Sequence, residues 1–188
     1  IGLFFCAEDL ISTIFYRGAF TQIDVLNSSY SLMAFSFGLP FFMLMKVLTP
    51  AFFARKDTKT PMYVALVSLL LNASLNYYLA FMLDFGHIGI ALGSSIAALI
   101  SVLILEFILY KDGFIKIKSV FNRFNIMILF SSLSLILFLN FYTNLTNFIE
   151  FSQVERLLYL SIEVIISIII YGAVSRLILR KPIQTLFE

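Results

Sequence analysis

The sequence is poor in the residues from which disulfide frameworks and metal centres are built. It has no tryptophan, one cysteine (Cys6) and one histidine (His87) among its 188 residues. One cysteine cannot form an internal disulfide or a thiolate metal site, and one histidine cannot build a histidine-rich site. Charge is also scarce, because only 13% of the residues are charged, whereas a soluble domain has about 25%.

Signals of catalysis and of nucleotide binding are missing as well. The sequence contains no G-x-x-x-x-G-K-[ST] phosphate-binding loop, and the lone His87 leaves no Ser/His/Asp set. We therefore expect a protein that is not an enzyme, that has no nucleic-acid partner, and that uses no cofactor apart from a coupling ion.

Apolar surface, in contrast, is abundant. Hydrophobic residues make up 61% of the chain, phenylalanine alone supplies 22 residues, and the mean hydropathy is +0.98. A membrane-spanning helix needs roughly 20 consecutive apolar residues. Five runs approach or exceed that length, at about 30–48, 62–83, 88–110, 126–142 and 157–179. The apolar start of the chain, ahead of Ile14, would be the end of a sixth.

These runs predict an all-α, polytopic transmembrane bundle of about five full membrane helices plus the end of a sixth. They do not alternate apolar and polar residues as the strands of a membrane β-barrel do. The segment Gly38–Pro40 interrupts the first run, and Pro40 is expected to kink its helix. The chain begins at Ile1 and turns acidic at Glu8, unlike a signal peptide, so we expect it to be a fragment.

Basic residues are concentrated in alternate connections. Ten of the thirteen Lys and Arg residues lie in the 49–60 loop, in the 111–125 loop or near the C-terminus. The other connections hold only Arg17 and Arg156, and Lys46 lies inside a helix end. Because cytoplasmic loops carry the excess of Lys and Arg, we place the three basic segments in the cytoplasm. The connections expected to face outward are 15–29, 84–87 and 143–156.

The 111–125 connection mixes apolar and basic residues, as in Phe114–Lys118. Such a pattern is typical of an amphipathic segment that lies on the inner leaflet of the membrane. It separates the first three complete helices from the last two.

Three polar residues fall inside the predicted membrane helices. Asn72 and Asn76 are four residues apart and share one helix face, and Ser94 lies on the next helix. Amide groups in hydrocarbon are costly unless they are paired. One interpretation is an interhelical hydrogen bond. The other is a Na⁺ site, because oxygen-only ligands suit a hard cation.

Three charged residues are candidates for contact with a transported substrate. Glu163 lies about two turns inside the last helix, where a carboxylate needs a partner helix or takes a headgroup or proton role. Lys46 either extends toward the membrane surface or faces an internal cavity where it would attract a phosphate. Arg17, next to Gly18, either forms an outer turn or touches a lipid headgroup.

Small residues recur every fourth position at Gly89, Gly93, Ala97 and Ser101. This stripe allows another helix to approach closely. We expect packing within the chain, with dimerisation as the alternative.

Two stretches of sequence point to a family. Residues 14–24 read IFYRGAFTQID, and residues 31–61 read SLMAFSFGLPFFMLMKVLTPAFFARKDTKTP. Together they resemble the MurJ/MviN family of lipid II flippases, which belongs to the multidrug/oligosaccharidyl-lipid/polysaccharide exporter superfamily. The second stretch matches a family pattern ending in "K-V-L-x-P-x-F-[YF]-[SA]-R-x-D-x-K-T-P", from Lys46 through Arg55 to Pro61. The rest of the chain matches in helix count and spacing.

The resemblance implies a 14-helix protein of the bacterial inner membrane with a cytoplasmic C-terminus. In it, residues 1–110 would be part of the second transmembrane lobe, from the end of helix 9 to helix 12. Residues 111–125 would be the cytoplasmic linker, and 126–188 the two additional C-terminal helices and tail, a pair that helps form a groove for the polyprenyl tail. Some members bind Na⁺ on the helices where Asn72, Asn76 and Ser94 fall.

The implied function is the flipping of lipid II, an undecaprenyl-pyrophosphate-linked peptidoglycan precursor, by alternating access between two lobes. The partners would be that lipid substrate, the surrounding membrane lipids and an N-terminal lobe that this chain does not contain. The alternatives are a related lipid-linked polysaccharide flippase or a drug/cation antiporter.

Overall fold

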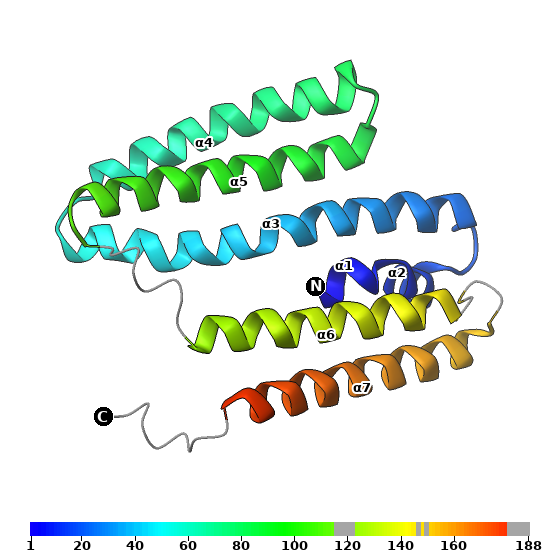
Figure 1. The fold of residues 1–188 in the computed structure, drawn as a ribbon. Coiled ribbons are helices and arrows are strands. Elements are labelled where there is room, and N and C mark those ends of the chain that lie inside the picture. The colour runs from blue at the N-terminus through cyan, green and yellow to red at the C-terminus, as the bar shows by residue number, and fades with distance from the viewer. Residues whose placement is uncertain (115–122, 146–147, 149–150, 180–188) are drawn as a thin grey trace. The chain divides into compact units, whose positions relative to one another are not determined.

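Helices account for the regular structure of the chain. The computed structural model describes residues 1–114, 123–145, 148 and 151–179 (Figure 1). The helices are α1 (Gly2–Phe5), α2 (Ala7–Phe15), α3 (Gln22–Ala54), α4 (Lys59–Tyr77), the π-helical turn η1 (Tyr78–Met82), α5 (Gly86–Lys111), α6 (Arg123–Leu145) and α7 (Gln153–Leu179). No strand occurs in these described ranges, which confirms the all-α prediction.

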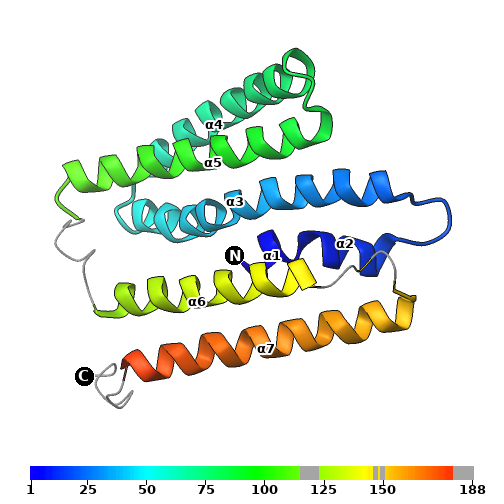
Figure 2. The same cartoon turned by 45° about the vertical axis from the view of Figure 1, so that its right-hand side comes forward.

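The chain forms two compact units. Unit 1 comprises Ile1–Val25 and Ile117–Glu188, and unit 2 comprises Leu26–Lys116. In both Figure 1 and Figure 2, α4 runs beside α5 and α6 runs beside α7. Each unit is therefore organised around an antiparallel helix pair.

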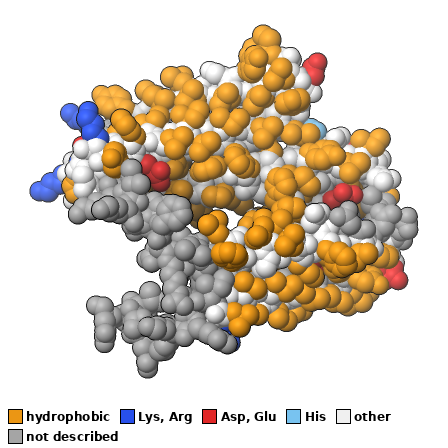
Figure 3. Space-filling model, in the orientation of Figure 1, with side chains coloured by type: hydrophobic (Ala, Val, Ile, Leu, Met, Phe, Trp, Pro, Cys, Tyr) orange, Lys and Arg blue, Asp and Glu red, His pale blue; other side chains and the backbone are white. Residues whose placement is uncertain are grey.

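Four helices of the described chain are long and apolar enough to cross a membrane: α3, α4 with η1, α5 and α7. A shorter apolar stretch, Ile128–Thr143, lies in α6. Large hydrophobic side chains are exposed along these helices, and they cover most of the face shown in Figure 3. Lipid is the solvent that suits such a surface.

The predicted interruption of the first span is wrong. Helix α3 runs without a break from Gln22 to Ala54 and contains both Pro40 and Pro50. A proline removes one backbone donor, but the remaining backbone groups must stay paired in hydrocarbon, which favours a continuous helix. The predicted 49–60 loop is correspondingly shorter, because α3 ends at Ala54 and α4 begins at Lys59.

The start of α3 was also predicted too late, at Tyr30. Thr21 and Asp24 form a reciprocal cap at its first turn: the Thr21 amide donates to Asp24 Oδ2 at 2.8 Å, and the Asp24 amide donates to Thr21 Oγ1 at 3.3 Å. These bonds satisfy amides that have no partner within the helix. The helix therefore begins eight residues before the apolar run does.

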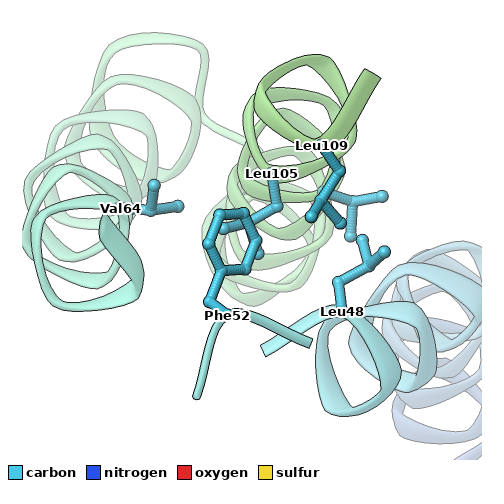
Figure 4. Close-up of a cluster of buried hydrophobic side chains, with 6 residues drawn as sticks. Leu48, Phe52, Val64, Leu105 and Leu109 are labelled. Carbon is cyan, nitrogen blue, oxygen red and sulfur yellow. The ribbon is translucent and has the colours of Figure 1, made fainter. Parts of the chain in front are cut away.

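The core of unit 2 lies where α3, α4 and α5 meet. Leu48 and Phe52 of α3, Val64 of α4, and Leu105 and Leu109 of α5 converge there (Figure 4). Phe52 and Leu105 are almost completely buried. Helix α5 is the central element, since it contributes buried residues along most of its length.

The stripe of small residues on α5 packs within the chain, as predicted. A Cβ atom added at Gly89 would lie 2.7 Å from the backbone nitrogen of Ala80, and one added at Gly93 would lie 3.1 Å from the backbone nitrogen of Asn76. Both neighbours belong to the α4–η1 segment. Ala97 and Ser101 are buried as well. The missing side chains therefore allow α5 to approach the backbone of the preceding helix.

Unit 1 consists of the α6–α7 pair with α1 and α2 packed against it. Helix α1 contacts α6, and α2 contacts α7. The predicted amphipathic segment 111–125 lies largely outside the described residues, between the end of α5 and the first turn of α6.

Candidate functional site

Polar side chains are buried or half-buried inside both units, at positions that the sequence places within membrane helices. One group joins α4 to α5 in unit 2, and the other joins α2 to α7 in unit 1. Buried polar groups of this kind are costly in hydrocarbon, so each is a candidate for function.

The structure brings together the three residues predicted to hold Na⁺. The Asn72 side-chain amide donates to Ser94 Oγ at 3.2 Å, and Asn76 Nδ2 lies 2.6 Å from Asn72 Oδ1. If the Asn76 amide is turned over, its nitrogen lies 3.1 Å from the carbonyl oxygen of Ile90. These contacts form the interhelical hydrogen bond that was one of the two predicted interpretations. The Na⁺ site stays a prediction.

The hydroxyl of the neighbouring Ser95 bonds to a different helix, α3. Its hydroxyl donates to the carbonyl of Ala34 in α3 at 2.7 Å and is fully buried. A Cβ atom at Gly38 would lie 2.9 Å from Ser95 Cβ, so the glycine makes room for this contact. Ser94 and Ser95 therefore attach α5 to two different helices.

Glu163 is fully buried in α7 and has a partner on another helix. The thiol of Cys6 donates to Glu163 Oε1 at 3.0 Å, whereas Oε2 has no partner in the described structure. This contact agrees with the interpretation that Glu163 has a partner on another helix, and a headgroup or proton role stays a prediction. Cys6 could not be singled out from the sequence, since 157 residues separate the pair.

Arg156 is a second buried charged residue in unit 1, and sequence reasoning missed its role. Its guanidinium donates to the carbonyls of Phe148 at 2.7 Å, Ser12 at 3.4 Å and Tyr16 at 3.2 Å. It also lies 4.6 Å from the centre of the Tyr16 ring. Because Ser12 and Tyr16 stand at the end of α2, the arginine caps that helix with a positive charge.

Lys46 and Arg17 are exposed in the described structure. Lys46 lies on α3, two turns before that helix ends. Arg17 follows α2 in a tight turn in which its amide donates to the Phe15 carbonyl at 2.7 Å and Gly18 has a φ of +63°. The position of Arg17 agrees with the outer-turn interpretation, and a role of either residue toward a substrate stays a prediction.

An ion pair joins the α3–α4 connection of unit 2 to the residue that follows α5. Arg55 Nη2 lies 2.6 Å from Asp112 Oδ2, and the guanidinium lies 4.3 Å from the centre of the Phe114 ring. Nearby, hydrogen bonds from the Thr60 hydroxyl and amide lower the pKa of Asp57 below its ordinary value. Lys and Arg side chains gather at this end of the unit in Figure 3. The end of α3, the start of α4 and the end of α5 thus form one cationic surface.

Long apolar helices with lipid-facing surfaces, buried polar groups between helices and cationic helix ends define the class of protein. It is a polytopic α-helical membrane protein. The sequence profile of the family described as "Lipid II flippase MurJ" matches residues 1–173, and the chain belongs to this family. It is accordingly a bacterial inner-membrane protein.

Relatives with this description are similar over about half of the chain or more. A "Probable lipid II flippase MurJ" of Rickettsia prowazekii is 43% identical over 97 residues, which cover 52% of this chain and 19% of the relative. That of Vibrio cholerae is 38% identical over 113 residues, covering 60% and 21%. The "Lipid II flippase MurJ" of Thermosipho africanus is 39% identical over 107 residues, covering 57% and 22%.

A solved structure, "Lipid II flippase MurJ, inward closed conformation", matches with 30% sequence identity and a TM-score of 0.72. The match covers 95% of this chain and 35% of that chain. The chain therefore spans about a fifth of the length of the curated relatives and about a third of the solved structure.

Proposed function

We propose that the chain is the C-terminal portion of a transporter that flips lipid II across the bacterial inner membrane. The observation that carries the proposal is the family match, which extends over residues 1–173 and so includes both helical units. Relatives and the matched structure bear the same description.

The physical problem is the transfer of a polar headgroup through hydrocarbon. Its charges and hydroxyls would lose their water in the bilayer, at a cost of several kcal/mol for each unpaired group. A transporter of this kind offers a polar cavity to the headgroup by alternating access, while the apolar tail stays in lipid. The N-terminal lobe would supply the other half of that cavity.

The helices of unit 1 suit the apolar tail. A groove of about 280 Å³ lies between α1–α2, α6 and α7 and is lined by Leu3, Leu10, Leu135, Val164 and Ile168, with Gly2, Cys6 and Ser167. Large aliphatic side chains are exposed along α7 as well. A polyprenyl chain would lie against these surfaces without exposing apolar area to water.

The orientation follows from the cationic ends. The surface around Arg55 and Asp112 would face the cytoplasm together with the C-terminus, and the 84–87 turn would face outward. Na⁺ at Asn72, Asn76 and Ser94 is a candidate coupling ion.

A chimera tests the proposal. The segment of the Vibrio cholerae relative that matches this chain would be replaced by residues 1–173, and flipping would be measured as lipid II exposed at the outer face of cells depleted of their own flippase. We expect the chimera to expose lipid II and sustain growth. The isolated chain, without the N-terminal lobe, should not flip lipid II in vesicles. A chimera that inserts at normal levels but moves another lipid-linked saccharide, and not lipid II, would overturn the substrate assignment.

A further inference from the structure

Glu163 has too few partners for an ionised carboxylate at its depth. It lies ten residues into α7, which is about 15 Å along the helix axis, and its side chain is fully buried. The only donor to it in the described structure is the Cys6 thiol, a weak one, and Oε2 is unpaired. An isolated carboxylate in such a place costs several kcal/mol unless a proton or a cation neutralises it.

A second buried carboxyl group, Asp9, lies on α2, which packs against α7. Tyr16, the residue after α2, accepts a hydrogen bond from Arg156 of α7 at the end of the unit. Asp9 lies seven residues before Tyr16, and Glu163 lies seven residues after Arg156, on helices that run in opposite directions. Asp9 also lies one turn after Cys6, whose thiol contacts Glu163, so the two carboxyl groups lie at about the same level.

The side chain of Asp9 is buried and also incompletely paired. It is 5% exposed, and Oδ2 has no partner in the described structure. The hydroxyls of Ser12 and Thr13 donate to the backbone carbonyl of Asp9 and not to its carboxylate. Two buried carboxyl groups therefore each present a free oxygen between α2 and α7.

Unpaired hydroxyls supply an independent indication of a ligand. Ser167, one turn beyond Glu163, has a buried Oγ without a partner in the described structure and lines the same groove as Cys6. Ser131 of α6 is fully buried with an unpaired Oγ, one turn from the groove-lining Leu135. The Ser167 hydroxyl thus lies in the groove that Cys6, the donor to Glu163, also lines, and the Ser131 hydroxyl lies one turn from it.

Among the residues that the structure describes, no cationic side chain bonds to either carboxyl group. On α2, Glu8 adds a further negative charge near Asp9. On α6, the Tyr142 hydroxyl donates to the Tyr159 carbonyl at 3.1 Å. On α7, Arg156 binds backbone carbonyls two turns away. The ion pair of the described structure, Arg55–Asp112, lies in the other unit.

We propose that Asp9 and Glu163 form a membrane-embedded site for one exchangeable monovalent cation, a proton or Na⁺, which is held between the two carboxyl groups with the Ser167 hydroxyl beside them. Occupancy removes the repulsion between the carboxylates and stabilises the packing of α2 on α7. The site goes beyond the proposed flippase function, because cation binding here does not depend on the substrate carried.

Infrared spectroscopy of the full 188-residue chain in lipid nanodiscs tests the site directly. A protonated carboxyl group in an apolar site gives a carbonyl stretching band that disappears when the group ionises. We expect such a band in the wild type, lost reversibly at alkaline pH or on addition of Na⁺, and weaker in Glu163→Gln, in which Asp9 is the remaining carboxyl group of the pair. If the band is lost with pH alone, the occupant is the proton. If the band is lost on addition of Na⁺ at constant pH, the occupant is Na⁺.

The matched control is Glu155→Gln, which removes an exposed carboxylate from the same helix and should keep the band. Thermal unfolding gives a second measurement: the midpoint of the wild type should depend on pH or Na⁺, and that of Glu163→Gln should not. A wild-type band that is absent, or that is unchanged across pH and Na⁺, overturns the proposal, because the carboxyl groups would then not exchange a cation. If Glu163→Gln does not fold, the wild-type titration decides alone.

Discussion

The guanidinium of Arg156 donates to the carbonyl oxygen of Tyr16 at 3.2 Å, although 140 residues separate the two. The same side chain is only 6% exposed and stacks on the Tyr16 ring. Arg156 was expected in the outward-facing 143–156 connection, but it lies in the first turn of α7, from which its buried charge reaches the end of α2. It fixes the level at which α2 and α7 pack, and with it the position of Asp9 opposite Glu163.

Replacement of Arg156 by alanine should destabilise unit 1. The carbonyls of Phe148 and Ser12 would lose a charged donor, at a cost of about 1.5–3 kcal/mol per such interaction. Arg156→Lys should recover only part of the loss, because a lysine lacks the planar fork that reaches several acceptors. Thermal unfolding in nanodiscs measures the effect, with the exposed Arg17→Ala as a control expected to be silent. Equal midpoints for Arg156→Ala and the wild type would refute the capping role.

The close approach of α5 to the α4–η1 segment predicts a strong effect at Gly89. A methyl group there would meet the backbone of Leu79 and Ala80, which cannot rotate away, so Gly89→Ala should cost about 1–3 kcal/mol of stability. Gly172→Ala in α7 is the matched control, because nothing lies within 4 Å of the added Cβ. It should be neutral or slightly stabilising, since alanine is the better helix former. If Gly89→Ala is as stable as the wild type, α5 and the α4–η1 segment pack less closely than in this structure.

Substitution of Asn72 and Asn76 distinguishes a role in hydrogen bonding between helices from a role in binding Na⁺. The double variant Asn72→Ala/Asn76→Ala loses the bond to Ser94, and such bonds in membranes contribute about 0.6 kcal/mol on average. If the residues bind Na⁺, the variant should also lose any stabilisation of the wild type by Na⁺. Ser74→Ala is the control, because that hydroxyl bonds only within its own helix. A double variant with the stability and the Na⁺ response of the wild type would contradict both roles.

Several of these relationships could be predicted from the sequence, and others could not. Apolar runs located the helices, and the glycine stripe indicated packing within the chain, because both are local and periodic signals. Glu163 stood out as a charge in an apolar helix, yet its partner Cys6 lies at the other end of the chain, and only the tertiary fold brings the two together. The early start of α3 depends on the Thr21–Asp24 cap, which a hydropathy reading overlooks.

The first turn of α4 should respond to acid through Asp57. Its pKa lies below the ordinary value of about 4 because the Thr60 hydroxyl and amide bond to the ionised carboxylate. The stabilisation is thus complete above the ordinary pKa and is lost as the pH falls through the lower folded value. Exchange of the Thr60 amide hydrogen, corrected for its intrinsic rate, should accelerate over that range. Asp57→Asn should abolish the pH dependence, and a pH-dependent rate in that variant would contradict the assignment.

We propose that this chain spans the inner membrane with its cationic helix ends in the cytoplasm. The most direct measurement is the labelling of single introduced cysteines, Lys56→Cys and His87→Cys, with a membrane-impermeant maleimide; the native Cys6 is buried and should not react. We expect position 87 to react in intact spheroplasts and position 56 to react only after the membrane is opened. Labelling of position 56 from outside, or of both positions from the same side, would contradict it.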